Sequence, residues 1–338
     1  MKVAIIGAGR IGERRARVAS AYPGTTVALV VDVDRRKAER VADQLGCGSG
    51  TDWQAAVQGR DLDCVVVATP NNLLAPVSTA ALCAGKHVLC EKPMATRIED
   101  AESMVDAARR SKVVLKVGYT LRHHPAIVRA RELITSGLIG DLMIVRGCYG
   151  HGGRPGYEKE WRCNPAIAGG GELIDQGVHL VDLARWFLGD FTEVMGMVAT
   201  SFWDIAPLED NVFALLKTRG STMASLHASL TQWKNRFTFE VFGPKGYCSI
   251  EGLGGSYGEE KLVMGMRNDR GSPPLEEIFT FSDDEIAWQD EWKDFIEAIQ
   301  SRKKPLAGGE EGLQTLRTVR AIYRSAELKK TVQLSEVE

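Results

Sequence analysis

The chain has 338 residues, a length that favours two domains over a single hydrophobic core. It is 44% hydrophobic and 25% charged, with a formal net charge of -2, which is ordinary for a soluble globular protein. Its basic residues form only short clusters, so no basic block of the kind that binds nucleic acid is present. No apolar run reaches the length of a membrane span, and no leader is expected before a first strand that begins at residue 2. Seven scattered cysteines without a CxxC pair favour reduced thiols in the cytoplasm and no metal site.

The amino-terminal residues predict a strand over 2–6, a helix over 13–20 and a second strand over 27–31. The turn after the first strand has the spacing G-x-G-x-x-G. Its first glycine permits a tight turn, its second lets the backbone approach a pyrophosphate, and its third lets the helix pack closely on the strand. The turn is formed by Gly7, Gly9, Arg10, Ile11 and Gly12. This context indicates a dinucleotide-binding site.

Asp32 ends the second strand, twenty residues after Gly12, where a carboxylate accepts from the ribose hydroxyls of a bound dinucleotide. The carboxylate favours NAD, because it would repel the 2′-phosphate of NADP. NADP stays the alternative, since Arg35 or Arg36 could meet that phosphate. We therefore predict NAD as the cofactor, with Arg36 near its adenosine ribose.

Strands and helices go on alternating up to residue 117. The predicted strands are 63–68, 87–90 and 113–117, and the predicted helices are 34–46, 53–57, 75–84 and 99–110. This order predicts a doubly wound parallel sheet with right-handed crossovers. Ligands bind beyond the carboxyl ends of such strands, where Thr69-Pro70-Asn71 and Glu91-Lys92 are found. Lys92 could contact the nicotinamide ribose and a substrate hydroxyl there, or be an ordinary surface lysine.

Beyond Asp141 the pattern changes to strands separated by short turns. The predicted strands are 142–147, 192–200, 211–217, 222–230, 236–242, 246–251, 261–266 and 276–281. The predicted helices are 125–135, 287–301 and 310–329. This order indicates a second, sheet-rich domain.

A helix is predicted over 172–188, after three consecutive glycines and before Gly189. On it, Asp175 and His179 are four residues apart and so share one face, which Asp182 continues. A carboxylate one turn from an imidazole can orient the ring and stabilise its protonated form, which makes the pair suited to acid–base chemistry. The alternative is that the two side chains only satisfy each other or backbone groups.

Six motifs together resemble the Gfo/Idh/MocA family of NAD(P)-dependent sugar and polyol oxidoreductases, in family order and at family spacing. They are VAIIGAGRIG at 3–12, TPNN at 69–72, AGKHVLCEKP at 84–93, VGYTLRHHP at 117–125, WRCNP at 161–165 and GGGELIDQGVHLVDL at 169–183. One departure is Leu74, where many members have a histidine near the nicotinamide.

The resemblance implies a Rossmann domain over 1–120 and a second domain over 121–338 with a large, open-faced, mostly antiparallel sheet. The helix at 310–329 would pack back on the first domain. The open sheet face would carry the contact of a homodimer or homotetramer.

The resemblance also implies a catalytic group of Lys92, Asp175 and His179. Cofactor contacts would come from Thr69, Pro70, Asn71, Glu91, Lys92, Trp161 and Arg162, besides the glycine turn, Asp32 and Arg36. Substrate contacts would come from Arg122, His151, Tyr157, Trp161 and Arg162, besides the catalytic group. For Arg122 and Arg162 the alternative is a structural ion pair, and for Trp161 it is the packing of an apolar loop.

The expected reaction is hydride transfer between nicotinamide C4 and a carbinol or ketone carbon of a sugar, sugar nucleotide or cyclitol. An NAD-dependent enzyme that cleaves glycosides through transient sugar oxidation is the first alternative. A non-enzymatic dinucleotide sensor is the second, and it has no need of proton-transfer groups at Lys92, Asp175 and His179.

Overall fold

The computed structural model describes residues 1–269, 271–282 and 285–337. The chain forms two compact units. Unit 1 contains Met1–Thr120, Ala166–Gly169 and Trp288–Leu313, and unit 2 contains the described residues of Leu121–Pro165, Gly170–Ala287 and Gln314–Glu338. The domain boundary at residue 120, and the packing of the last helix on the first domain, stay predictions.

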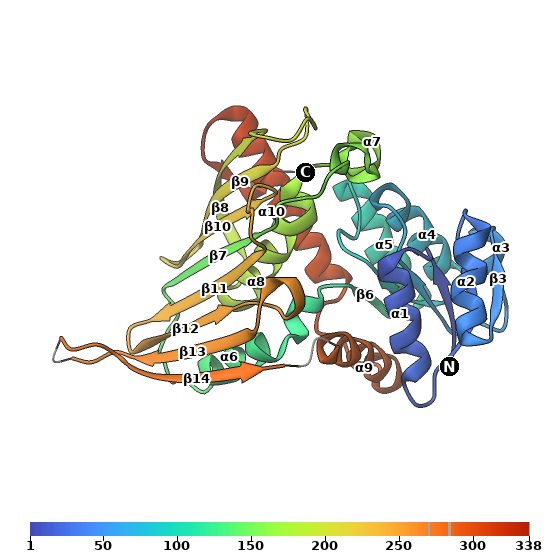
Figure 1. Cartoon of the computed structure of the whole chain (residues 1–338), viewed down its shortest axis with the longest axis horizontal. Coiled ribbons are helices and arrows are strands. Elements are labelled where there is room, and N and C mark those ends of the chain that lie inside the picture. The colour runs from blue at the N-terminus through green and yellow to red at the C-terminus, as the bar shows by residue number, and fades with distance from the viewer. Residues whose placement is uncertain (270, 283–284, 338) are drawn as a thin grey trace. The chain divides into compact units, whose positions relative to one another are not determined.

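Unit 1, whose amino-terminal part is blue to cyan in Figure 1, is built on a parallel sheet. The strand order β3-β2-β1-β4-β5-β6 confirms the predicted doubly wound sheet. Its strands are β1 (Lys2–Ile6), β2 (Thr26–Val31), β3 (Gly48–Gly50), β4 (Cys64–Val67), β5 (His87–Cys90) and β6 (Leu115–Val117). Its helices include α1 (Arg10–Ala21), α2 (Arg35–Leu45), α3 (Trp53–Val57), α4 (Asn71–Cys83) and α5 (Ile98–Ser111). The strand order reverses between β1 and β4, the place where open α/β sheets bind ligands.

Two elements of unit 1 differ from the prediction. Helix α4 begins at Asn71 instead of residue 75, so the loop after β4 is only a few residues long. Strand β3 was not predicted, because its residues Gly-Ser-Gly have little preference for extended structure, and it exists through its pairing with β2.

A helix from the carboxy-terminal part of the chain completes the core of unit 1. Helix α9 (Ile286–Ser301) buries Trp292, Phe295 and Ile296 in the same cluster as Val3 and Ile5 of β1. Since burial of a large apolar side chain contributes about 1.5–3 kcal/mol, these three residues fix α9 against unit 1.

Unit 2 contains a mixed, mostly antiparallel sheet, as predicted, in which only β7 and β10 pair in parallel among the described strands. The strand order is β14-β13-β12-β11-β7-β10-β9-β8-β15. The strands are β7 (Ile144–Gly150), β8 (Phe191–Ala199), β9 (Asn211–Thr218), β10 (Met223–Ser229), β11 (Arg236–Gly243), β12 (Gly246–Glu251), β13 (Glu260–Met266), β14 (Leu275–Phe281) and β15 (Val332–Gln333).

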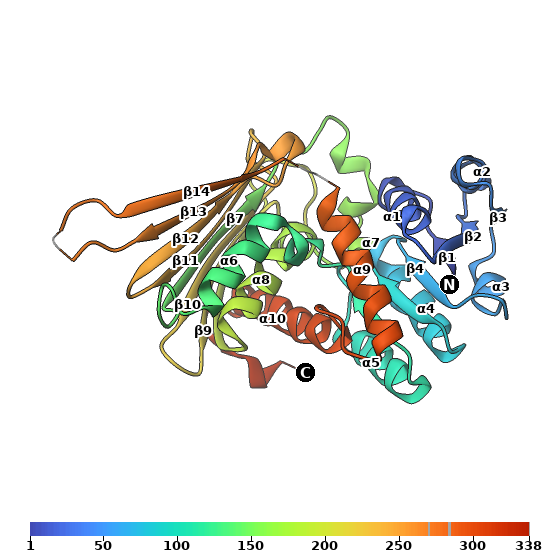
Figure 2. The ribbon, with the colours of Figure 1, turned by 90° about the horizontal axis from the view of Figure 1, so that it is seen from below.

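Helices α6 (Pro125–Thr135) and α8 (Val178–Leu188) pack on one face of this sheet (Figure 2). The last helix, α10 (Gly309–Leu328), begins in unit 1 and continues in unit 2. Along β9 the side chains alternate between buried and exposed, as expected for a sheet covered on one face. None of the helices in the described ranges is long and apolar enough to cross a membrane.

Candidate active site

The glycine turn after β1 has the geometry that the motif requires. Gly7 has a φ of 99°, in the region that favours glycine, and a Cβ on Gly12 would lie only 1.8 Å from the Gly7 carbonyl oxygen. A Cβ on Gly9, in contrast, would have no protein atom within 4 Å. Because no side chain caps the first turn of α1, the backbone beside Gly9 is open to an anionic group.

Asp32 lies against the same turn. Its Oδ2 accepts a hydrogen bond from Ala8 N at 2.7 Å, and its Oδ1 accepts from Asp34 N at 2.9 Å. Two backbone donors fix the carboxylate and leave lone pairs for further donors, as ribose hydroxyls would be. Arg36 is exposed in the first turn of α2.

The residues after β4 add one unsatisfied group. The Oγ1 of Thr69 is buried and has no hydrogen-bond partner among the described residues. Asn71 is used within the unit, because its Nδ2 donates to Ala168 O at 2.9 Å. An open backbone at Gly9, a fixed carboxylate at Asp32 and an orphaned hydroxyl at Thr69 fit a dinucleotide.

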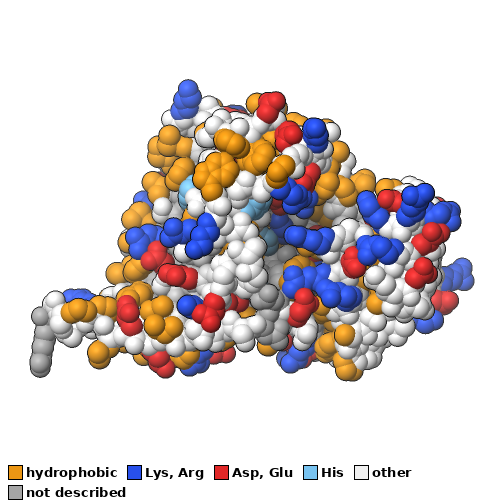
Figure 3. All heavy atoms as spheres, viewed as in Figure 1, with side chains coloured by type: hydrophobic (Ala, Val, Ile, Leu, Met, Phe, Trp, Pro, Cys, Tyr) orange, Lys and Arg blue, Asp and Glu red, His pale blue; other side chains and the backbone are white. Residues whose placement is uncertain are grey.

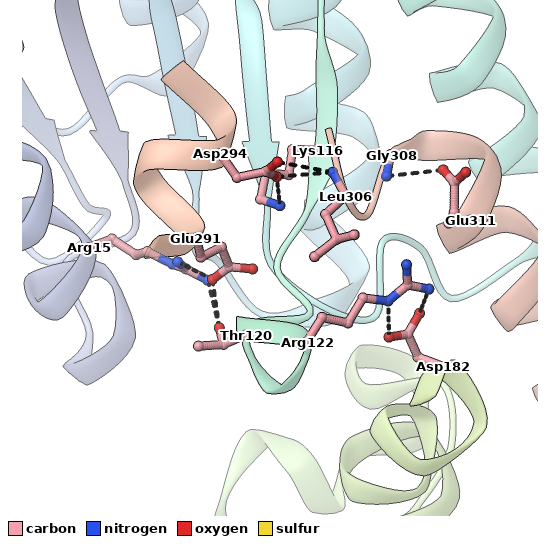
Figure 4. Close-up of polar contacts among 10 residues, drawn as sticks. All are labelled: Arg15, Lys116, Thr120, Arg122, Asp182, Glu291, Asp294, Leu306, Gly308 and Glu311. Atoms are coloured by element: carbon pink, nitrogen blue, oxygen red, sulfur yellow. Dashed lines mark hydrogen bonds and ion pairs between the residues drawn. The ribbon is translucent and has the colours of Figure 1, made fainter. Parts of the chain in front are cut away.

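Lys92 is the second residue after β5, is half-buried, and is joined to Pro93 by a cis peptide bond. The preceding Glu91 is anchored by Arg15 of α1, whose Nε donates to Glu91 Oε1 at 2.7 Å. Arg15 also pairs with Glu291 of α9 at 2.5 Å (Figure 4). Glu291 in turn accepts from the Thr120 hydroxyl at 2.6 Å. The turn that carries Lys92 is therefore tied to a buried charge network of unit 1.

In unit 2 the predicted helix over 172–188 forms, but its first part is not α-helical. Residues Leu173–Gly177 make a π-helical turn, and α8 begins at Val178. Asp175 thus lies in the π turn and His179 in the first turn of α8, so the spacing of a regular α-helix does not describe them. Single π turns inside helices are frequent at functional sites.

Glu209 holds the start of this helix. Its carboxylate accepts from Leu173 N at 3.0 Å and from Gly171 N at 3.2 Å, and the Tyr323 hydroxyl donates to it at 2.7 Å. A Cβ on Gly171 would lie 2.1 Å from the Glu209 carbonyl oxygen, so only glycine permits this approach. Burial raises the pKa of Glu209, although hydrogen bonds from Tyr323 and Leu173 oppose that shift.

The next residue, Asp210, organises a neighbouring loop. It is fully buried, and its carboxylate accepts from Ser201 N and Phe202 N at 2.8 Å and from Trp203 N at 3.1 Å. Burial raises the pKa of Asp210, but these backbone hydrogen bonds outweigh it and hold the pKa below its ordinary value of 3.8. Two adjacent carboxylates therefore fix the helix of Asp175 and the loop at 201–203.

We expect Asp210→Asn to lower the free energy of unfolding by about 2–3 kcal/mol at pH 7, because hydrogen bonds to a charged acceptor are lost. A carboxylate whose folded pKa is depressed stabilises the fold above its unfolded value of 3.8 and loses that contribution as pH falls through the folded pKa. The difference in free energy of unfolding between wild type and Asp210→Asn should therefore shrink as the pH falls below 3.8. Urea denaturation at pH 7 and at pH 3 measures it, and an equal difference at both values would contradict the assignment.

Asp175 is surrounded by predicted site residues. Arg162 Nε lies 3.3 Å from Asp175 Oδ2, and the Arg162 guanidinium lies over the Trp161 ring at 4.5 Å. Burial raises the pKa of Tyr157, and the nearby charges of Asp175 and Glu172 raise it further. Unit 2 thus brings Tyr157, Trp161, Arg162 and Asp175 together. Arg162 forms an ion pair, as its alternative stated, and the partner is the candidate acid Asp175.

His179 is 8% exposed and lies beside Tyr149, with ring centroids 6.0 Å apart. Tyr149 in turn contacts Tyr257 at 5.3 Å. Burial is the main cause that raises the pKa of Tyr149, and Tyr257, Asp175 and Glu172 raise it further. The sequence analysis did not identify these two tyrosines. The only signal available was the position of Tyr149 two residues before His151, at the end of a strand.

Arg122 forms the structural ion pair that was its alternative. Its Nε and one terminal nitrogen bond Asp182 at 2.8 and 2.7 Å, and both side chains are buried (Figure 4). Asp182 is therefore paired with Arg122 rather than acting beside Asp175. A contact between Arg122 and substrate stays a prediction.

His151 lies beside Tyr157, with ring centroids 6.2 Å apart, and its Nδ1 accepts from Gly153 N at 3.0 Å. It therefore shares the loop of Tyr157 in unit 2. Lys92 and the glycine turn belong to unit 1. Convergence of Lys92 with Asp175 and His179 is part of the proposal below.

A dinucleotide turn on a parallel sheet, in one chain with a second, open sheet whose packed helix carries an acid and a histidine, defines a class of two-domain NAD(P)-dependent oxidoreductases. The chain belongs to the Gfo/Idh/MocA family of this class. Residues 1–119 match the model described as "Oxidoreductase family, NAD-binding Rossmann fold", and residues 127–249 match the GFO/IDH/MocA C-terminal domain.

Individual relatives agree. The 1,5-anhydro-D-fructose reductase of Ensifer adhaerens is 30% identical over 99% of this chain and 98% of the relative. The levoglucosan dehydrogenase of Pseudarthrobacter phenanthrenivorans is 28% identical over 73% of this chain and 72% of the relative. A solved levoglucosan dehydrogenase, in complex with NADH and levoglucosan, has a TM-score of 0.90 and 25% identity over 99% of both chains. NAD(P) is the cofactor of this chain.

Proposed function

We propose that the chain transfers a hydride between nicotinamide C4 and a ring carbinol or ketone carbon of a sugar, sugar nucleotide or cyclitol. The observation that carries this proposal is the group around Asp175 and His179. A buried imidazole, a carboxylate paired with Arg162 and several tyrosine hydroxyls supply donors and acceptors for neighbouring hydroxyls of a ring. Two relatives are named for levoglucosan and for 1,5-anhydro-D-fructose, which supports a sugar as the substrate.

In oxidation, His179 accepts the proton of the substrate hydroxyl while the carbon gives up its hydrogen with the electron pair. Bound NAD supplies the hydride acceptor. Lys92 donates a hydrogen bond to the same oxygen and stabilises the negative charge that develops on it. Asp175 orients a second substrate hydroxyl or His179, and Arg162 holds Asp175. Reduction reverses these proton movements.

The test is a panel of D-glucose, methyl glucosides, myo-inositol and UDP-glucose with the full chain and NAD or NADP. We expect NADH to accumulate with at least one of them, and the melting temperature of the NAD-loaded protein to rise with the same compound. Binding of NAD without reduction by any of them would contradict the proposal. Release of an aglycone without net NADH would favour the glycoside-cleaving alternative.

Self-association through the open sheet face belongs to the same proposal. Exposed apolar side chains pair across β8 and β9, Met195 with Leu215 and Met197 with Phe213. Hydrophobic side chains also gather over the part of unit 2 that contains β8 to β10 (Figure 3). Exposed apolar patches of this kind mark interaction surfaces. We further propose a cytoplasmic location, supported by seven free cysteines.

Phe213→Asp should convert the proposed dimer or tetramer into monomers, because it places a charge among the exposed apolar side chains of that face. Sedimentation velocity of the full chain measures the change. Arg109→Ala on α5 of unit 1, which removes an exposed side chain paired with Asp106, is the control and should keep the oligomer. A monomeric wild-type protein would overturn this part of the proposal.

A further inference from the structure

Two large aromatic side chains of unit 2 stay exposed while in contact with each other. Phe202 is 63% exposed and Trp233 is 66% exposed, and their ring centroids lie 4.8 Å apart at an interplanar angle of 76°. Single exposed apolar residues are ordinary, but an exposed aromatic pair keeps contiguous apolar surface in water, and such patches are often functional.

The pair is presented by a rigid loop. Asp210 bonds the backbone of residues 201–203, Thr200 Oγ1 donates to Leu208 O at 2.7 Å, and Trp203 Nε1 donates to Leu230 O at 3.1 Å. The last bond links the loop of Phe202 to the segment that leads into Trp233. Because the backbone is fixed in this way, the exposed rings are preorganised for a ligand instead of collapsing into the core.

An aromatic strip leads from this pair to Tyr157, which is close in the chain to Arg162, the partner of Asp175. Trp203 contacts Phe202 at 5.3 Å and Tyr157 at 5.8 Å. Tyr157 is buried, and its carbonyl oxygen accepts a hydrogen bond from Cys163 Sγ at 3.1 Å, beside Arg162, whose Nε lies 3.3 Å from Asp175 Oδ2. The loop before Tyr157 packs on the same rings, since a Cβ on Gly153 would lie 2.5 Å from Trp203 and one on Gly152 would lie 3.3 Å from Trp233.

We propose that Phe202 and Trp233 form an outer sugar subsite, which stacks on the second ring of a disaccharide or glycoside whose first ring is oxidised beside Asp175 and His179. This inference rests on the proposed function. A pyranose presents an apolar C–H face that suits an aromatic ring, and its hydroxyls need polar neighbours. Gln232 and Lys234 flank Trp233 in the sequence, and Asp204 lies two residues after Phe202, so we assign this role to them.

A second copy of the chain is the other occupant that an exposed apolar pair could serve. The oligomer contact proposed above lies on the strands of the open sheet face, whereas Phe202 and Trp233 lie on the loops between β8 and β9 and between β10 and β11. The pair also lies on loops that adjoin Tyr157, and its rings are the outer end of the strip that leads to that residue. These observations favour the sugar.

The test compares kcat/KM for maltose and cellobiose with kcat/KM for the methyl glucopyranoside of the same anomeric configuration. For the better disaccharide, Phe202→Ala/Trp233→Ala should lower the ratio of the two values about tenfold, since two aromatic contacts are lost. Leu275→Ala, which removes an exposed apolar side chain of β14, is the control and should keep the ratio. An unchanged ratio in the double variant would overturn the inference.

Binding separates this inference from the proposed function. The proposed function fails if no sugar, sugar nucleotide or cyclitol is oxidised. The subsite is judged separately, by tryptophan fluorescence of the NAD-loaded protein titrated with the same disaccharides and methyl glucosides. Wild type should bind one disaccharide at least tenfold more tightly than the methyl glucoside, and Trp233→Phe should lose the part of the spectral change that only the disaccharide produces. Equal affinities would overturn the subsite. Dissociation of an oligomer in Phe202→Ala/Trp233→Ala would also overturn the subsite, because it would show that the two rings contact a second copy of the chain.

Discussion

His179→Ala should lower kcat by about 10²–10⁴-fold, the usual contribution of a positioned acid or base. The dissociation constant for NADH should stay within about twofold, because the glycine turn and Asp32 that hold the dinucleotide belong to unit 1 and His179 to unit 2. Lys92→Ala should lower kcat similarly, since it removes a cation that stabilises the developing alkoxide. Steady-state NADH absorbance and NADH fluorescence titration measure the two quantities.

Two controls make this result specific. His227→Ala removes a histidine that is stacked on Phe213 at 4.0 Å on the sheet of unit 2, and it should change kcat little. Lys92→Arg keeps the positive charge and should recover part of the rate lost in Lys92→Ala, provided that the role is electrostatic. Unchanged turnover in both alanine variants would remove these residues from the chemistry.

Arg15→Met should lower the free energy of unfolding by about 3–5 kcal/mol, because it leaves two carboxylates without their cation in the interior of unit 1. The Arg15 side chain is 1% exposed, the Glu291 side chain is 0% exposed and that of Glu91 is 12% exposed. The guanidinium also lies over the Trp288 ring at 4.5 Å. Urea denaturation measures the change.

The exposed pair of Arg40 and Glu13, which has two bonds of 2.9 and 2.8 Å, provides a matched control. Arg40→Met should have a far smaller effect, because solvent screens that pair. Arg15→Met/Glu291→Gln should be more stable than Arg15→Met alone, since the variant no longer buries the Glu291 charge unpaired. A loss in Arg15→Met no larger than in Arg40→Met would contradict the account of this network.

Local patterns were enough to predict much of unit 1. A buried strand, the G-x-G-x-x-G turn, a helix and Asp32 lie within one stretch of chain, and each depends mainly on near neighbours. Strand-like runs likewise predicted β7 to β14 of the second sheet, but not the two-residue strand β15. The membership of α9 in the first core could not be predicted, because an amphipathic helix does not reveal which sheet it covers.

The candidate site was predicted in residue types but not in its geometry. The π turn at 173–177 depends on the approach of Glu209 to Gly171, and Arg122 pairs with Asp182 across 60 residues of chain. Arg15 and Glu291 are 276 residues apart. Such contacts follow from the tertiary fold, so a local pattern contains no signal for them. The contact of Tyr149 with His179 could not be predicted either, because in the sequence Tyr149 looks like an ordinary strand residue.

The central claim, that this chain moves a hydride from a ring carbon of a sugar or cyclitol, is tested most directly by isotope transfer. The wild-type protein is incubated with NAD and glucosides or myo-inositol that carry deuterium on every ring carbon, and the reduced cofactor is analysed by mass spectrometry. We predict one deuterium per reduced nicotinamide with at least one substrate, and a strongly reduced yield in His179→Ala. NAD that is bound but acquires no deuterium from any of these compounds would contradict the account.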